Sequence, residues 1–186
     1  MAIAQDSPGY KVKEGMYGVL YYGDTLASYA SPTTAIAGLV KTLPATDVND
    51  QDTANLYDNT DKSCGEYASQ QAGLKSGSIT TTIFRHFGEE NTYEFFRALY
   101  RNKDRGLFCY ASGPLKTDSD VTALTPGDDG FLFEGMISSF TSAQPINGLQ
   151  TVQVTITKCR HIADLQVNAS KQLEVVSYSE EESASN

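Results

Sequence analysis

Histidine and cysteine are the side chains of this sequence with the widest chemical repertoire, and they are few. The histidines and cysteines are His86, His161, Cys64, Cys109 and Cys159. Cys159 and His161 would share one face of a strand, where such a pair could ligate a metal ion or act as nucleophile and base. A metal site needs three or four ligands, and no second cluster of ligands lies near this pair in the sequence. We therefore expect neither a metal site nor a Cys–His catalytic pair.

The other segments that resemble chemical motifs are equally incomplete. Asp128 and Asp129 lie beside glycines in a turn, whereas a calcium loop needs a longer run of oxygen ligands. The sequence contains no phosphate-binding loop of the Gly-x-x-x-x-Gly-Lys type. No nucleophile, base and orienting group can be combined into one constellation. The sequence therefore predicts a protein that is not an enzyme, with no catalytic residue, no bound metal and no cofactor.

Length and composition are those of an ordinary single-domain protein. Its 186 residues are enough to bury about 70% of the surface of the unfolded chain. No run of apolar residues is long enough for a membrane-spanning helix, and residues 1–6 lack the features of a secretory signal. We therefore expect synthesis in a reducing cytoplasm, where the cysteines remain free and pack as small apolar residues.

The formal net charge of −9 bears on whether this protein can bind nucleic acid. The charge argues against a sequence-specific nucleic-acid-binding protein, which would carry a basic face. It is compatible with a surface along which nucleic acid passes without sticking, because an acidic wall repels phosphate.

Two segments near the C-terminal end predict a β-hairpin. Residues 131–140 are rich in aromatic and aliphatic side chains around Gly135, which predicts a strand that bends there. In residues 150–158, apolar residues at every second position alternate with polar ones, as in a strand with one buried face. This hairpin contains no catalytic residue and is typical of a protein whose task is assembly. Further strands are predicted at residues 16–22, 35–43, 77–87, 106–112 and 173–178.

Between these strands the sequence predicts one strong helix. Asn91 can cap its first turn, with Glu94 at the return position of a capping box. Apolar residues at helical spacing, from Phe95 to Tyr100, would bury one face. The predicted fold class is therefore mainly β (α+β), with β-sandwich or barrel-forming sheets flanked by one α-helix.

Residues 45–76 form a long polar segment with five aspartates and few apolar residues. A loop of this length is uncommon in a compact domain and is usually functional or disordered. The segment is either a mobile solvated loop or an extended loop arm that becomes ordered against a neighbouring copy of the chain. The rest of the chain divides into a flexible N-terminal arm (1–14), a β-sandwich domain (15–176) and an acidic disordered tail (177–186).

The acidic residues of the loop arm have a basic counterpart at the end of the predicted helix. Pairing of the two sets between copies would set the orientation of assembly, although each exposed pair contributes only about 1 kcal/mol or less. The alternative is that both sets are simply solvated. The residues concerned are Asp47, Asp50, Asp52, Asp58 and Asp61 on the arm and Arg97, Arg101, Lys103 and Arg105 at the helix end.

In this order, the segments resemble the major tail tube protein of long-tailed, siphophage-type bacteriophages. Each motif alone is a pattern of small and apolar residues, so the order of the segments carries the resemblance, which covers about residues 15–162. A tyrosine-rich first strand and the acidic segment belong to it as well. The other matching segments are residues 36–44, 73–83, 93–100, 133–140 and 149–157.

The resemblance implies a structural virion protein, made in the host cytoplasm and located in the tail. Subunits of that family form hexameric rings whose inner sheets join into one barrel, and the rings stack into a hollow tube. The implied partners are further copies of the chain, the tape-measure protein, and the tail terminator and tail-tip or baseplate proteins. DNA passes through the lumen transiently and without specificity, and no membrane is involved. Residues 45–76 would reach a neighbouring subunit or ring.

Two other interpretations remain open. The tube of a contractile tail or secretion system shares the fold, and only a sheath partner would distinguish it. A β-sandwich module for capsid decoration or receptor contact would instead need an exposed aromatic patch, which Tyr21, Tyr22 or Tyr29 could supply.

Overall fold

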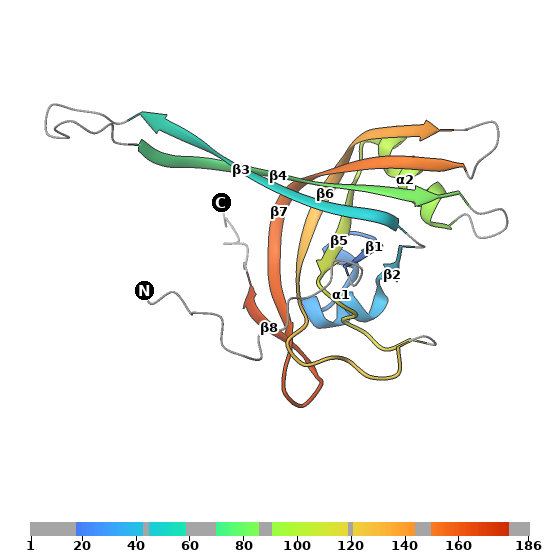
Figure 1. Cartoon of the computed structure of the whole chain (residues 1–186), viewed down its shortest axis with the longest axis vertical. Coiled ribbons are helices and arrows are strands. Elements are labelled where there is room, and N and C mark those ends of the chain that lie inside the picture. Colours follow the sequence, from blue (N-terminus) through green and yellow to red (C-terminus); the bar gives the residue numbers. More distant parts are fainter. Residues whose placement is uncertain are drawn as a thin grey trace, which may run out of the picture.

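The computed structural model describes residues 18–42, 45–58, 70–85, 91–118, 121–143 and 150–178. Within these residues eight strands outnumber two α-helices, which confirms the predicted mainly β fold (Figure 1). None of the helices described there is long and apolar enough to cross a membrane. The elements are β1 Val19–Gly23, the 3₁₀ turn η2 Leu26–Ser28, α1 Pro32–Gly38, β2 Val40–Lys41, β3 Ala45–Asp58, β4 Gln70–Phe84, α2 Asn91–Asn102, β5 Arg105–Ala111, β6 Asp129–Ala143, β7 Thr151–Val167 and β8 Leu173–Tyr178.

All of these strands belong to one sheet with the order β2-β1-β5-β6-β7-β4-β3, in which neighbours are antiparallel. β7 is long enough to take part in two half-sheets. Its residues 151–157 pair with β4, and its residues 163–167 pair with β8. We call β6–β7–β4–β3 the arm half-sheet, and we call β2–β1–β5–β6–β7–β8 the body half-sheet.

The two half-sheets meet where β6 and β7 bend. The register between these strands shifts at three places, after Leu132, Glu134 and Ile137, and such bulges bend and twist a strand. Gly135 is required at the bend, because a Cβ there would lie 2.7 Å from Ile156 Cγ2 and 3.0 Å from the carbonyl oxygen of Thr157. The bend predicted at Gly135 is therefore confirmed.

Two hydrophobic cores lie on opposite faces of this sheet, as the alternation of side chains along a strand requires. On β1, Tyr21 belongs to the core beneath α1, whereas Leu20 and Tyr22 belong to the core beneath α2. The α2 core also buries Phe96 and the predicted apolar positions of β7, which are Val152, Val154 and Ile156.

The structure corrects the prediction of a strand over residues 35–43. Residues 32–38 form α1, and β2 contains two residues only. The signals for this helix are Ser31, whose hydroxyl accepts a hydrogen bond from the Thr34 N–H at 3.2 Å, and Pro32 at the first helical position. The domain thus has a second α-helix besides the predicted one. In α2, Asn91 is the first helical residue, and its side chain lies outside the description, so the predicted cap stays a prediction.

The structure also corrects the prediction that residues 45–76 form a loop. Residues 45–58 and 70–76 are strands of a β3–β4 hairpin, and residues 59–69 lie outside the description. The segment has few apolar residues, and residues 49–54 are exposed. A ribbon of this kind satisfies its backbone by cross-strand hydrogen bonds and does not need a buried face. The predicted terminal arm and tail, residues 1–14 and 177–186, fall almost entirely outside the described residues and stay predictions.

Candidate functional site

The β3–β4 hairpin extends well beyond the strands that anchor it (Figure 1). β4 pairs with β7 only from Ser78 onward, whereas its pairing with β3 continues out to Gln70, opposite Asp58. We call residues 52–58 and 70–77 the outer hairpin. Its outer end points away from α2 (Figure 1). A polar two-stranded ribbon without a third strand has little stability of its own, so this segment is the first candidate for contact with another copy.

A lysine from the body of the sheet fixes the root of the outer hairpin. Lys158 Nζ lies 2.6 Å from Asp50 Oδ1 and 2.8 Å from Asp52 Oδ1. The lysine side chain is only 14% exposed, and its ammonium lies 4.5 Å from the ring centroid of Phe131. Since Lys158 is on β7 and both aspartates are on β3, the ion pairs span the intervening strand β4.

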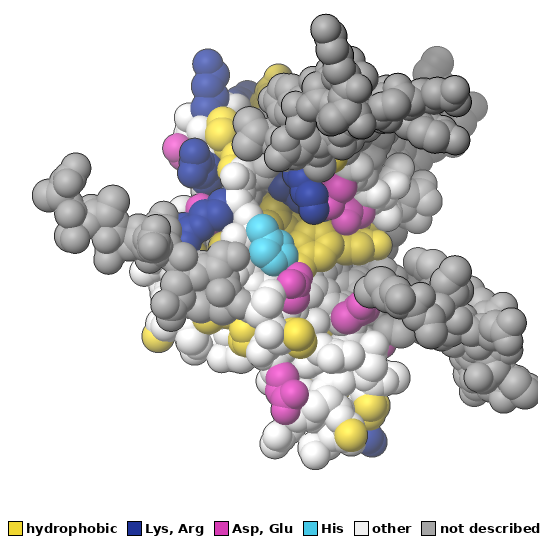
Figure 2. Space-filling model, turned by 90° about the vertical axis from the view of Figure 1, so that its left-hand side faces the viewer, with side chains coloured by type: hydrophobic (Ala, Val, Ile, Leu, Met, Phe, Trp, Pro, Cys, Tyr) yellow, Lys and Arg dark blue, Asp and Glu magenta, His cyan; other side chains and the backbone are white. Residues whose placement is uncertain are grey.

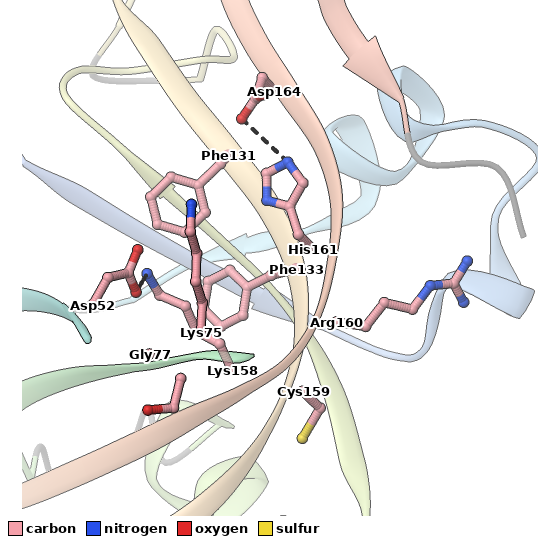
Figure 3. Close-up of a pocket in the computed structure, with 11 residues that line it drawn as sticks. Asp52, Lys75, Gly77, Phe131, Phe133, Lys158, Cys159, Arg160, His161 and Asp164 are labelled. Atoms are coloured by element: carbon pink, nitrogen blue, oxygen red, sulfur yellow. Dashed lines mark hydrogen bonds and ion pairs between the residues drawn. The ribbon is translucent and has the colours of Figure 1, made fainter. Parts of the chain in front are cut away.

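Gly77 of β4 makes this crossing possible. A Cβ at Gly77 would overlap Asp52 Oδ1 and would lie 2.8 Å from Lys158 Cδ. The glycine therefore leaves the space through which the lysine side chain reaches β3 (Figure 3). One row of three residues, Lys158, Gly77 and Asp52, joins the body of the sheet to the outer hairpin.

The same row borders a groove of about 460 Å³ at the bend of the sheet. Phe131 and Phe133 form its apolar floor, and basic, acidic and histidine side chains gather around it (Figure 2 and Figure 3). His161 Nε2 lies 3.3 Å from Asp164 Oδ1, but both side chains are about half exposed, so this pair contributes little to stability.

The Cys159–His161 pair lies on the wall of this groove without forming a site. The Cys159 thiol donates to the Thr157 carbonyl at 3.7 Å, and the two side chains point in different directions (Figure 3). Within the described residues no three His, Cys, Asp or Glu side chains are placed to hold a metal ion. The groove therefore offers charge and an apolar floor, but no assembled catalytic group.

The predicted contact residues are found in three situations. Asp50 and Asp52 pair with Lys158, whereas Arg97 pairs with Glu94 at 3.4 Å. Arg101, Lys103 and Arg105 are exposed at the end of α2 and the start of β5. Asp47 and Asp58 lie on β3 with side chains outside the description, and Asp61 lies outside it altogether. In the part of the subunit that the structure describes, the acidic and basic sets do not meet.

Lys158 is the residue that reasoning from the sequence missed. The available signal was its position at the end of a strand whose residues 150–157 carry no charge. A single lysine there needs a partner if it is buried. The sequence could not show that the partner lies two strands away.

Two edges of the arm half-sheet are open in the described structure. The outer edge of β3 pairs with no other strand there, and residues 137–143 of β6 pair with β7 on one side only. Open edges present unpaired N–H and C=O groups to any strand that approaches. They are the second candidate for contact between copies.

No family model matches this chain, and no curated protein matches it. Among solved structures, the fold is similar to that of a chain in the tail of an empty gene transfer agent particle, a tail with C6 symmetry. The TM-score is 0.56 and the sequence identity is 15%, and the match covers 86% of this chain and 96% of that chain. The SPP1 tail tube gives a TM-score of 0.55 at 14% identity, covering 80% and 76%. A chain of the native gene transfer agent virion gives a TM-score of 0.58 at 14% identity, covering 89% and 100%.

Identities this low establish likeness of fold and nothing beyond it. The likeness extends over at least 80% of this chain, so it includes both half-sheets rather than one shared motif. The resemblance seen in the order of the sequence segments is thereby confirmed at the level of architecture: the chain has the fold of phage tail tube proteins.

Proposed function

We propose that this chain is a structural subunit of a phage tail tube, located in the virion tail, and that it is not an enzyme. The observation that carries the proposal is the tail-tube fold combined with the outer hairpin. A domain of this size gains nothing from projecting a polar ribbon into water, because ordering that backbone costs conformational entropy without burying apolar surface. A neighbouring copy would supply the missing contacts.

The open edges of the arm half-sheet support assembly into rings. Residues 137–143 of β6 and the outer edge of β3 lie at opposite sides of this half-sheet. Pairing of one edge with the other edge of the next copy is a heterologous contact, and such contacts close into a ring when the rotation between copies allows it. Ring closure would remove both edges and join the sheets into one barrel. We infer hexameric rings, in line with the C6 symmetry of the gene transfer agent tail.

The charges support a direction for stacking the rings. The outer hairpin, which includes Asp52 and Asp58, extends away from α2 (Figure 1). Arg101, Lys103 and Arg105 are exposed at the end of α2 and the start of β5. Contact between the hairpin of one copy and the α2 end of another would join opposite charges that lie apart within one subunit. Exposed pairs of this kind choose orientation more than they add affinity.

The proposed tube implies the partners of a tail. They are further copies of the chain, a tape-measure protein that sets the length, a tail terminator, and tail-tip or baseplate proteins, with DNA passing through the lumen. The tube of a contractile tail or secretion system would use the same fold, and a sheath partner would distinguish it.

The alternative function, a receptor-contact module, requires an exposed aromatic patch, and the tyrosines that could supply it are buried or packed against a core. Tyr21 and Tyr22 are 1% and 3% exposed, and Tyr29 packs against the core beneath α1. The Tyr21 hydroxyl accepts from the Leu115 N–H at 3.2 Å, and the Tyr22 hydroxyl lies 2.9 Å from Thr92 Oγ1. These tyrosines hold elements together inside the domain and do not form an exposed patch.

Electron microscopy of the purified chain at high concentration tests the proposal. We expect hollow tubes of stacked rings, either from the chain alone or after addition of a tail-tip complex that initiates assembly. A chain that stays monomeric under both conditions would refute a tube function.

A further inference from the structure

One edge of β7 has a gap in its pairing. Along this edge residues 151–157 pair with β4 and residues 163–167 pair with β8, whereas residues 158–162 pair with no described strand. The other edge of β7 pairs with β6 through the same stretch. We call the gap between β4 and β8 the fork. The groove at the bend lies along it, with Lys75 on the β4 side and residues 158–161 on the β7 side. An open edge of this kind can accept a further strand.

β8 is directed into the fork. It runs antiparallel to β7 and ends at Tyr178, opposite Ala163, so a continued strand would next pass residue 162. The end of β8 is fixed at the rim of the groove, because the Ser177 hydroxyl donates to Asp164 Oδ2 at 2.5 Å and Asp164 lines the groove. The chain therefore needs no turn or loop to reach the fork.

The sequence that follows β8 is long enough to fill the fork. We call residues 179–186 the C-terminal segment. At about 3.4 Å per residue, its eight residues span about 27 Å when extended. The five residues 158–162 of β7 span about 17 Å by the same measure. The C-terminal segment can thus pass the whole fork without leaving the sheet.

The C-terminal segment and the groove have opposite charges. The segment contains three consecutive glutamates, at positions 180–182, and no basic residue. Two acidic side chains of the groove are already paired within the domain, Asp52 with Lys158 at 2.8 Å and Asp164 with His161 at 3.3 Å. The groove gathers more cations than these pairs use, since it is lined by Lys75, Lys158, Arg160 and His161.

The strand register would bring the glutamates to these side chains. Continued in the register of β8, a strand places Glu180 opposite His161. Glu181 then lies opposite Arg160, whose side chain points away from His161 (Figure 3). Bulges in β7 can shift this register by one residue, and consecutive glutamates tolerate such a shift. Lys75, across the groove, is exposed and has no ion-pair partner among the described residues.

We propose that residues 179–183 continue β8 through the fork as a strand of the same subunit, with the glutamates beside Arg160, His161 and Lys75. The occupant is the subunit's own segment, because a segment that begins at the fork has an effective concentration of the order of millimolar there, which another copy would have to match. This assignment replaces the disordered tail that the composition predicts. The added strand would hold β4 to β7 at the base of the outer hairpin. The proposal concerns the single subunit and does not depend on the tube function.

Hydrogen exchange of the monomer tests whether the fork is filled. A chain that ends at Tyr178 lacks the C-terminal segment, and a chain that ends at Ser183 is the matched control, since it keeps the proposed strand. In the shorter chain, amides of residues 158–162 should exchange at least about tenfold faster than in the full chain. Amides of residues 163–167, which pair with β8, should be unchanged. Equal exchange at residues 158–162 in the full chain and the shorter chain would overturn the proposal.

Removal of the charges tests the glutamates. Glu180→Gln, Glu181→Gln and Glu182→Gln are combined, and Ser183→Ala with Ser185→Ala alters uncharged positions of the segment as the control. The glutamine variant should exchange about threefold or more faster at residues 158–162 in low salt, because several exposed ion pairs are lost together. High salt should reduce the difference. Identical exchange of the glutamine variant and the unchanged chain at low salt would overturn the role of the glutamates.

A disulfide with Cys159 tests whether the strand comes from the same subunit. Glu181→Cys, Glu182→Cys and Ser183→Cys are made one at a time with Cys64→Ser, and Cys159→Ser is the control that should abolish the bond. Mild oxidation should join at least one of the new cysteines to Cys159 within one chain, because paired strands bring Cβ atoms within bonding range. The rate should not depend on protein concentration. Bonds that form only between chains, or with none of the three cysteines, would overturn the assignment.

Discussion

Lys158 Nζ lies 2.6 Å from Asp50 Oδ1, so a residue of β7 is joined to β3 across the whole width of β4. The pair is partly protected from water, with the lysine 14% and the aspartate 26% exposed. Asp52, at 2.8 Å, is 64% exposed. This connection stabilises the angle at which the outer hairpin leaves the domain, because it links the hairpin to the strand that bends beneath it.

Replacing the lysine should loosen the hairpin. Lys158→Met keeps most of the side-chain volume but leaves two carboxylates without their cation, and we expect a loss of about 1–3 kcal/mol in the free energy of unfolding. This is less than for a fully buried pair, because Asp52 faces solvent. Hydrogen exchange should accelerate in β3 and in the outer part of β4. Arg101→Gln, which removes an exposed cation, serves as the control, and equal stability losses in the two variants would argue against the connection.

Most of the outer hairpin can be removed without changing Asp50, Asp52 or Gly77, the residues at its base. Thr53 and Ser76 are cross-strand partners, so an Asn-Gly turn that joins them directly would close the hairpin in its native register. We expect the shortened protein to melt within about 5 °C of the full chain, since the described residues of both hydrophobic cores are all retained. Electron microscopy should show no tubes. Tubes of normal length from this variant would show that the outer hairpin is dispensable for assembly.

Charge reversal at the end of α2 should slow assembly. Arg97→Glu combined with Arg101→Glu replaces two cations that would face the acidic hairpin of another copy. The rate of tube growth, followed by light scattering, should fall most at low ionic strength, where exposed charges are least screened. Lys171→Glu, in the β7–β8 turn, makes a single charge reversal away from α2 and should leave the rate unchanged. A rate that does not depend on the α2 charges at low salt would remove this helix end from the interface.

Stability should fall in alkaline solution. Burial raises the pKa of the Cys109 thiol far above its ordinary value of 9.0, and burial also raises the pKa of the Tyr21 and Tyr22 hydroxyls above 10.0. The native state therefore keeps protons that the unfolded state releases, above about pH 9 for the thiol and above about pH 10 for the two tyrosines. Above its own threshold each group lowers the free energy of unfolding by about 1.4 kcal/mol per pH unit. Urea unfolding at neutral and alkaline pH measures the slope. A midpoint that is constant up to pH 10 or above would contradict it.

Local patterns in the sequence predicted a large part of the fold. The alternation at residues 152–156 placed the buried face of β7, and the glycine among the aromatic residues of β6 located the bend. The helical spacing from Phe95 to Tyr100 identified α2, although Tyr100 remains 43% exposed and stacks on Phe140. These features follow from periodicity along the chain, which the sequence contains directly.

The local signals also failed in two places. Ser31 and Pro32 mark the start of α1, but the apolar residues that follow them suit a short strand equally well. In β3 most residues are polar, so no clear periodicity distinguishes a strand from a loop. β3 exists because β4 supplies its hydrogen-bond partners, and that pairing joins residues as far apart as Ala45 and Ile83.

The sequence by itself determined that this protein is a mainly β domain, and it located the acidic and basic residues along the chain. Only the tertiary structure decided which of those charges meet. Lys158 reaches Asp50 because register and a glycine bring β7 and β3 within one side-chain length. A two-residue period tells which side chains share a face of one strand. The hydrogen-bond register between distant strands decides which of them become neighbours.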